Sequence, residues 1–263
     1  MKYVSLSGLT MTDVNGTEVY ATSELSLIRY PHTLDVKKET RNTLIAAGIV
    51  AAVFVTAYAS VIMYAGTSTP FYTVESGSMM HSDKSKIGII DTGDMVLVRD
   101  PSKVNITTYV EGHSTGYSKF GDYGDVIIYK DGSRTIIHRA MVYVEYDPGT
   151  DKWTVRGITG TFSGIFECDE FSVNLDALAP GSGYITKGDN NIPNDNGLVT
   201  DDMIIAVAAY EVPWLGCIKL FLTGSGSDIP MNSVWSLIIT IIVIILAVVG
   251  ASILYDKLTK KKG

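Results

Sequence analysis

Two long apolar stretches without charge constrain the fold of this chain more than any other feature. Residues 43–65 (TLIAAGIVAAVFVTAYASVIMYA) and 234–254 (VWSLIITIIVIILAVVGASIL) contain no Asp, Glu, Lys or Arg. As helices rising about 1.5 Å per residue, both are long enough to cross a hydrocarbon core of about 30 Å. A helix also satisfies its own backbone hydrogen bonds, which lipid cannot do. The sequence therefore predicts two transmembrane helices, over residues 43–65 and 233–255.

Two other interpretations of these stretches remain open. Either stretch could be a helix buried in the core of a soluble domain. The first could also be a cleaved signal sequence, because Ala57-Tyr58-Ala59 resembles an A-x-A cleavage site. Forty-two residues precede that stretch, which is long for the charged region of a signal sequence, so we favour two membrane spans.

Basic residues flank both stretches on their outer sides and predict the orientation. They are Arg29, Lys37, Lys38 and Arg41 before the first stretch, and Lys257, Lys260, Lys261 and Lys262 after the second. Positive charge marks the cytoplasmic side of a membrane protein. We therefore expect a multi-pass protein of the cell membrane, with cytoplasmic tails over residues 1–42 and 256–263. Residues 66–232 then form an extracytoplasmic domain.

The charge of the central domain limits its partners. Residues 66–231 carry 12 Lys and Arg against 22 Asp and Glu, so nothing favours binding to nucleic acid. Cys168 and Cys217, both in this part, could form a disulfide outside the cell or remain free. Two cysteines 49 residues apart without matching histidines are a poor metal site, and we expect no metal and no cofactor.

Short alternating segments indicate a mostly β domain between the two helices. Strands are expected over residues 70–74, 95–99, 125–130, 133–146, 153–156, 183–186 and 204–212. Polar segments near residues 101–123 and 157–180 interrupt them as inserts. Many short strands joined by Gly and Asp turns are typical of a coiled, partly closed barrel. The tail before residue 42 lacks a clear period and is expected to be partly disordered.

Candidate chemistry begins directly after the first span. Ser78 lies between a glycine and a methionine where the membrane would end and the folded domain begin. A serine nucleophile needs a base, and histidine has a pKa near working pH. His138 is the best candidate because it lies on an expected strand. His81 follows Ser78 too closely, and His113 lies in a polar insert. His138 could equally be a structural strand residue.

A hairpin count suggests an acidic partner for His138. Asp131-Gly132 between two apolar strands is a strong signal for a two-residue turn. Centring the turn there pairs Lys130 with Ser133 and places Asp125 opposite His138, on the same face.

Five short motifs give the chain a resemblance to a known family. The chain resembles type I signal peptidases through motifs in the family's order: Ser76-Gly77-Ser78-Met79, Gly93-Asp94-Met95-Val96, Gly124-Asp125-Val126, Ile137-His138-Arg139 and Lys187-Gly188-Asp189-Asn190-Asn191. The His-Arg pair in place of a catalytic lysine is similar to the archaeal and endoplasmic-reticulum branch. The resemblance covers the core of residues 76–222 and leaves out the tail and the two inserts.

The resemblance implies a function and a set of site residues. It implies a serine endopeptidase that removes signal peptides from exported preproteins at the outer membrane face, after small residues. It assigns the nucleophile to Ser78, the general base to His138, and acidic partners to Asp195 and Asp189. It places the Ser76 hydroxyl and the Ser78 N–H in an oxyanion hole. The implied partners are signal-peptide-bearing preproteins and the lipid bilayer, with a secretion translocon as a further candidate.

Some points depart from the family or stay open. His81 occupies a position where the family usually has proline, and the insert over residues 157–180 lengthens the interval before Asp189. The hairpin count favours Asp125 as the partner of His138, whereas the resemblance favours Asp195 and then Asp189. Two other functions remain in view: a related membrane serine peptidase acting in self-cleavage or regulated proteolysis, and a non-catalytic surface or assembly protein on the same scaffold.

Overall fold

The computed structural model describes residues 11–12, 18–19, 36–225 and 229–260. The chain divides into two compact units, Met1–Phe54 and Val55–Gly263. In the first unit, β1 (Met11–Thr12) pairs with β2 (Glu18–Val19), and helix α1 (Val36–Ala65) begins. Most of the predicted disordered tail lies outside the described residues. Within them, the helix starts ahead of the expected span.

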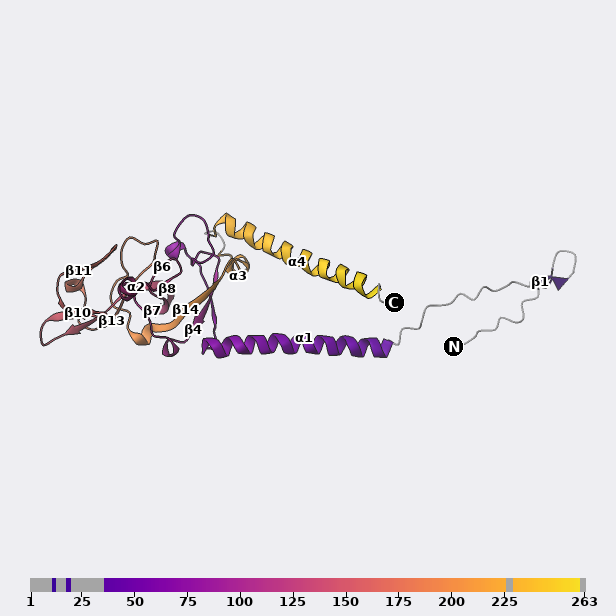
Figure 1. Cartoon of the computed structure of the whole chain (residues 1–263), viewed down its shortest axis with the longest axis horizontal. Helices are drawn as coiled ribbons and strands as arrows, with labels where there is room; N and C mark the ends of the chain where they lie inside the picture. Colours follow the sequence, from indigo (N-terminus) through magenta and orange to yellow (C-terminus); the bar gives the residue numbers. More distant parts are fainter. Residues whose placement is uncertain (1–10, 13–17, 20–35, 226–228, 261–263) are drawn as a thin grey trace. The chain divides into compact units, whose positions relative to one another are not determined.

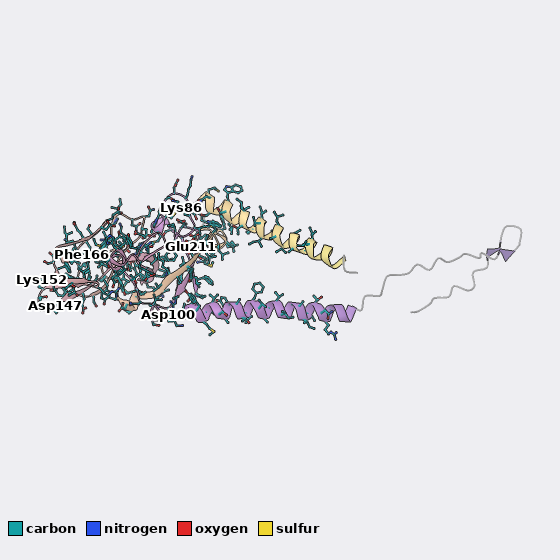
Figure 2. The ribbon with its side chains drawn as sticks, viewed as in Figure 1. Lys86, Asp100, Asp147, Lys152, Phe166 and Glu211 are labelled. Carbon is teal, nitrogen blue, oxygen red and sulfur yellow. The ribbon has the colours of Figure 1, made fainter. Side chains whose placement is uncertain are left out.

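Two long apolar helices lie where the sequence analysis expects membrane spans. α1 and α4 (Met231–Lys260) contain 30 residues each. Their apolar segments, Thr40–Ala65 and Met231–Leu254, have mean hydropathies of 2.3 and 3.2. The most apolar 18-residue window of each segment is not buried within the protein, and side chains project from both helices (Figure 2). Ala65 and Ser233, near the ends that meet the sheet domain, are buried. A helix buried in a soluble core would be covered, so length, composition and exposure together are compatible with membrane spans.

The second unit is built on one antiparallel sheet (Figure 1). Its strands are β3 (Phe71–Thr73), β4 (Met95–Arg99), β7 (Val126–Asp131), β8 (Arg134–Asp147), β9 (Lys152–Val155), β10 (Ile158–Phe162), β13 (Ser182–Lys187) and β14 (Ile204–Val212). They run in the order β10-β9-β8-β7-β14-β4-β3, and β13 pairs with β8 beside this path. The sheet is open among the described strands, with β10 and β3 at its two ends. The mostly β prediction is confirmed, whereas a closed barrel is not seen.

Alternating side chains explain why these segments form strands. In β4 the inward residues Val96 and Val98 are fully buried, while their neighbours are partly exposed. They pack in one cluster with Val126, Ile128 and Met79, the residue after Ser78. This period of two is the sequence pattern of a sheet with one face on a core.

Both predicted inserts are ordered. The first contains η2 (Pro101–Lys103), α2 (Tyr109–Thr115) and the pair β5 (Ser118–Lys119) and β6 (Asp122–Tyr123). The second contains β10, the hairpin β11 (Ile165–Cys168) and β12 (Phe171–Asn174), and η3 (Leu175–Ala177). α2 begins with a capping box in which Thr108 and Glu111 bond reciprocally. This Thr-x-x-Glu pattern was readable in the sequence and marks a helix that our interpretation missed.

The register of the β7–β8 hairpin corrects the sequence count. Asp131 pairs with Arg134, so the turn is Gly132-Ser133, and His138 faces Ile127. Gly132 has a positive φ of 59°, which this tight turn needs. An ion pair of 2.5 Å between Arg134 Nη2 and Asp131 Oδ2 spans the last rung of the hairpin. Asp125 therefore does not lie opposite His138; its carbonyl accepts from the Ala140 N–H.

The start of α4 and the end of α1 are hydrogen-bonded to the sheet domain. The Asp100 N–H donates to the Ala65 carbonyl at 2.7 Å. Asn232 exchanges two hydrogen bonds with the backbone of Ser85, at 3.2 and 2.9 Å. Helix α3 (Gly216–Thr223) packs beside α4 and buries Cys217. Both cysteines are free thiols, so the predicted disulfide alternative is absent from the structure.

Candidate active site

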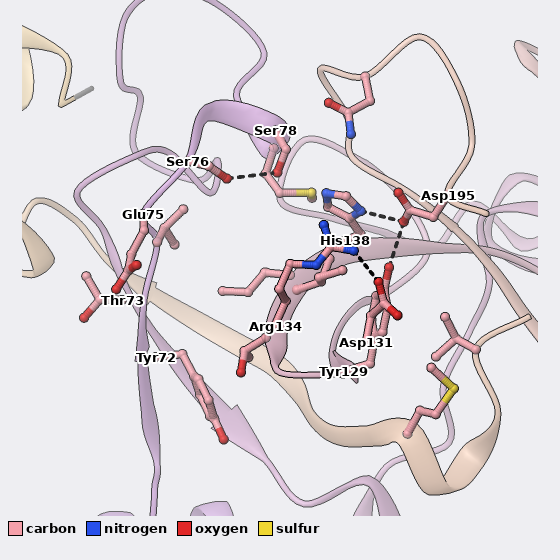
Figure 3. A pocket seen from close by; sticks show the side chains of 18 of the residues that line it. Tyr72, Thr73, Glu75, Ser76, Ser78, Tyr129, Asp131, Arg134, His138 and Asp195 are labelled. Carbon is pink, nitrogen blue, oxygen red and sulfur yellow. Dashed lines mark hydrogen bonds and ion pairs between the residues drawn. The ribbon is translucent and has the colours of Figure 1, made fainter. Parts of the chain in front are cut away.

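One groove gathers most of the residues that the sequence analysis singled out. Its volume is about 940 Å³, and Figure 3 shows it from close by. Its walls come from β3, from the segment after it, from the first half of β8, and from the loop after β13. We call residues 74–81 the nucleophile loop and residues 188–196 the acid loop. Ser76, Ser78, His138 and Asp195 all line the groove, whereas Asp189 does not.

The nucleophile loop presents Ser78 on a short 3-10 turn. This turn, η1 (Gly77–Met79), follows Ser76 in an extended conformation. Met79 is buried in the core beneath the turn and holds it down, which leaves Ser78 half-buried at the groove. The Ser78 hydroxyl lies 3.4 Å from the Ser76 hydroxyl. Ser76 is thus placed where its hydroxyl could donate a hydrogen bond to an oxyanion that develops beside Ser78.

His138 faces Asp195 with one nitrogen and the nucleophile loop with the other. Nδ1 of His138 lies 2.6 Å from Asp195 Oδ2. A carboxylate only accepts hydrogen bonds, so Nδ1 carries the proton and Nε2 is the free basic nitrogen. A Cβ built on Gly188 would lie 2.9 Å from Nε2 and 2.6 Å from the Ser78 carbonyl oxygen. Nε2 and the Ser78 carbonyl oxygen therefore both border the space beside Gly188, so Nε2 faces the nucleophile loop (Figure 3).

Asp195 is held as a carboxylate by three donors. Besides His138, the hydroxyls of Thr186 and Tyr129 donate to Oδ2 at 2.6 and 2.9 Å. Burial raises the pKa of Asp195, but the hydrogen bonds from His138, Thr186 and Tyr129 outweigh it, and the pKa lies below its usual value. The carboxylate is therefore charged and fixed where it can orient the imidazole.

Asp189 has other partners. Arg139 is fully buried and binds it with two hydrogen bonds, from Nε at 2.8 Å and from Nη2 at 2.6 Å. His81 Nε2 lies 2.9 Å from the same carboxylate. Burial raises the pKa of Asp189, but the hydrogen bonds from His81 and Arg139 lower it by more. The pKa therefore lies below its usual value, and this group is also ionised. Of the two acids assigned by the resemblance, only Asp195 contacts His138.

Asp125, the acid favoured by the hairpin count, belongs to a different network. It accepts hydrogen bonds from the Thr107 N–H at 2.9 Å and from the Tyr117 hydroxyl at 2.8 Å. Lys119 Nζ lies 3.6 Å away. These contacts hold the first insert against the start of β7. The hairpin prediction that Asp125 lies opposite His138 is wrong.

Of the other histidines that the structure describes, His81 and His113 do not line the groove. His113 lies on α2, 3.9 Å from Asp169, and His32 falls outside the described residues.

Among the described residues, Ser78 Oγ has Ser76 as its hydrogen-bond partner and makes no bond to His138. Catalytic hydrogen bonds are often long in empty sites and tighten when substrate enters.

Several supporting residues were not singled out from the sequence. Tyr129 and Thr186 gave no distinct signal, because both residue types are common in β-strands. Tyr129 follows the apolar run Val126-Ile127-Ile128, and Thr186 lies between Ile185 and Lys187. Asn190 stands within a quoted motif; its N–H donates to the Ser78 carbonyl at 2.8 Å, and its side chain donates to the Gly77 carbonyl at 3.0 Å. Within the described part of the chain, no three His, Cys, Asp or Glu side chains are grouped to hold a metal ion.

This arrangement holds a hydroxyl, an imidazole and a carboxylate around one groove, which is the set needed for acyl transfer by serine. No model of a known protein family matches the chain, and no curated protein is detectably similar to it.

Proposed function

We propose that the chain is a membrane-anchored serine endopeptidase that removes signal peptides from exported preproteins. The observation that carries the proposal is the His138–Asp195 pair, whose free Nε2 is directed toward the Ser78 loop inside an open groove. The two apolar helices support a membrane location. The flanking basic residues support an external position for the sheet domain.

In the proposed reaction, the Ser78 hydroxyl attacks the scissile carbonyl carbon while His138 Nε2 takes its proton. The imidazolium that forms is stabilised by the Asp195 carboxylate. The Ser76 hydroxyl and the Ser78 N–H donate to the oxyanion of the tetrahedral intermediate. The C–N bond then breaks, and His138 gives its proton to the leaving amine of the mature protein. Water then gives a proton to His138 and attacks the acyl carbon. The bond from that carbon to Ser78 Oγ breaks, His138 returns the proton to Oγ, and the signal peptide leaves with a new carboxyl group.

Two unpaired strand edges suggest how substrate binds. β3 pairs with β4 on one side only, and residues 134–138 of β8 pair with β7 on one side only among the described strands. Both segments border the groove. An extended peptide between them would gain main-chain hydrogen bonds by strand addition. Such a strand would also link β3 to β8 and complete a ring with β7, β14 and β4, which is our proposal for the partly closed barrel.

A preprotein assay tests this function. The full-length protein in detergent is expected to cut a preprotein with Ala-x-Ala at its site once, after the second alanine. Replacing that alanine by tryptophan should abolish the cut, because a shallow pocket excludes a large side chain. A second preparation carrying Ser78→Ala controls for contaminating peptidases. Equal cutting of the alanine and tryptophan substrates would show that no small pocket exists.

A further inference from the structure

The nucleophile loop is tied to the acid loop on both sides of Ser78. On one side, Asn190 donates to the carbonyls of Gly77 and Ser78, as described above. On the other side, His81 bonds to Asp189. Ser78 thus lies between two contacts that join the same pair of loops. A change in either contact changes where the hydroxyl stands relative to His138.

The anchor of the second contact is rigid. Arg139 holds Asp189 with two bonds and donates from Nη1 to the carbonyls of Lys119, Asp122, Tyr123 and Gly124, at 2.9–3.3 Å. Arg139 is fully buried, and the Asp189 side chain is only 5% exposed. Asp189 therefore does not move easily, and a bond to it fixes the far end of the nucleophile loop.

His81 can gain and lose charge at this contact. Its side chain is 27% exposed, so protons exchange with solvent. The hydrogen bond to Asp189 raises the pKa of His81 above its usual value, against an opposing effect of burial. The charged groups that act on it are Asp189, Asp122 and Asp91, which favour the imidazolium, and Arg139, which opposes it.

We propose that His81 is a positioning residue whose protonated imidazole clamps the nucleophile loop onto Asp189, and that the peptidase activity weakens as this clamp is deprotonated. The inference rests on the function proposed above. Protonation gives His81 a positive charge and adds Coulombic attraction to the ionised Asp189 carboxylate, so the clamp is strongest as an ion pair.

The sign of the pH effect follows from the raised pKa. At a pH below the pKa that His81 has in the unfolded chain, the clamp is fully present. It is lost as the pH rises through the higher pKa that His81 has in the folded protein. His81 does not line the groove, so substrate binding should be little affected. Loss of the clamp should therefore lower kcat about tenfold, through misplacement of Ser78, and leave KM within about twofold.

The test compares the full-length wild type with His81→Gln and His81→Ala, using the Ala-x-Ala preprotein from pH 5 to 9. Glutamine can keep a donor near Asp189 but cannot titrate. Wild type should lose kcat on the alkaline side, and His81→Gln should lack this alkaline loss while sharing the acidic limb. His81→Ala should have low kcat throughout. His113→Gln, which changes a histidine remote from the groove, is the matched control and should follow wild type.

A second readout does not depend on activity. Hydrogen exchange of the Asn190 amide, measured by mass spectrometry on peptides covering residues 186–195, should be slower in wild type than in His81→Gln at low pH and equal at high pH. If wild type does not cut but this difference is present, the proposed function fails and the clamp stands. If wild type cuts and the three proteins share one pH profile and one exchange pattern, the clamp is wrong.

Discussion

At the residue scale, three aspartates illustrate how hydrogen-bond partners set the role of a carboxylate. Asp195 bonds to His138, Asp189 bonds to Arg139 and His81, and Asp125 bonds to backbone and hydroxyl donors of the first insert. Only the first can select the imidazole tautomer that leaves Nε2 basic and stabilise the imidazolium.

Substitution of these aspartates by asparagine should separate the three roles. Asp195→Asn should lower turnover by roughly three to four orders of magnitude with little change in melting temperature, because the wrong tautomer would be held. Asp189→Asn should lower both, since it leaves the buried Arg139 charge unpaired. Asp125→Asn should lower melting temperature only. Turnover and melting temperature of the three variants check this, and a dead but well-folded Asp125→Asn would contradict it.

Gly188 gives a second prediction at this scale. A side-chain carbon there would come within 2.6 Å of the Ser78 carbonyl and 2.9 Å of His138 Nε2, and both are too close to persist. Gly188→Ala should therefore push Ser78 and His138 apart and lower kcat at least a hundredfold, since small displacements are costly in catalysis. Gly149→Ala, in a turn where the nearest atom to an added carbon is 3.3 Å away, is the control and should keep full kcat.

The sequence supplied the residues of the site, but two arguments from it disagreed on their pairing. The resemblance put Asp195 first as the partner of His138, which is the contact seen, and the hairpin count favoured Asp125. The motifs identified Ser78, His138 and Asp195, and the groove brings these three together. Which acid meets His138 depends on Arg139, the next residue on the same strand, which points to the opposite face and captures Asp189. That choice arises from packing across β8, and no local pattern in the sequence encodes it.

At the element scale, two strands were predicted with the bounds that the structure has. Met95–Arg99 and Ile204–Val212 match β4 and β14 at both ends. The hairpin register failed because a turn of Asp, Gly and Ser can be centred at either of two positions, and the cross-strand pair of Asp131 and Arg134 decides between them. The β11–β12 hairpin was missed because it buries few residues and its outer face gives no clean period.

Glu211, which contacts the segment between the nucleophile loop and β4, should make the stability of the protein depend on pH. The β14 residue Glu211 accepts the Gly88 N–H at 2.5 Å, and burial, with Asp94 and Asp91 nearby, raises its pKa to about 7. An acid with a raised folded pKa binds more protons in the folded state, so stability falls as pH rises from its unfolded pKa toward about 7. Glu211→Gln should remove this loss. Its melting temperature should exceed that of wild type at pH 8 and match it at pH 4.5. A variant that melts below wild type at pH 8 would contradict the assignment.

At the scale of the whole molecule, the position of the groove matters only if the sheet domain faces outward. The basic flanks of both apolar helices predict that the two tails lie on the cytoplasmic side. Protease added to spheroplasts should therefore digest residues 66–231 and leave a tag on the C-terminus intact. Detergent-lysed spheroplasts, in which the tag must be cut, are the control. A tag cut in intact spheroplasts would reverse the orientation and remove the access to exported substrates.

Covalent capture of Ser78 tests the central claim most directly, that its hydroxyl is a nucleophile activated by His138 and Asp195. The full-length protein in detergent is treated with a serine-reactive fluorophosphonate, and the adduct is located by mass spectrometry of the digested protein. The account predicts one adduct on Ser78 in wild type, none in Ser78→Ala, and labelling slowed at least a hundredfold in His138→Ala, which is the low end of what a general base contributes. Equal labelling of wild type and Ser78→Ala, or no labelling of wild type while its melting temperature shows a folded protein, would contradict it.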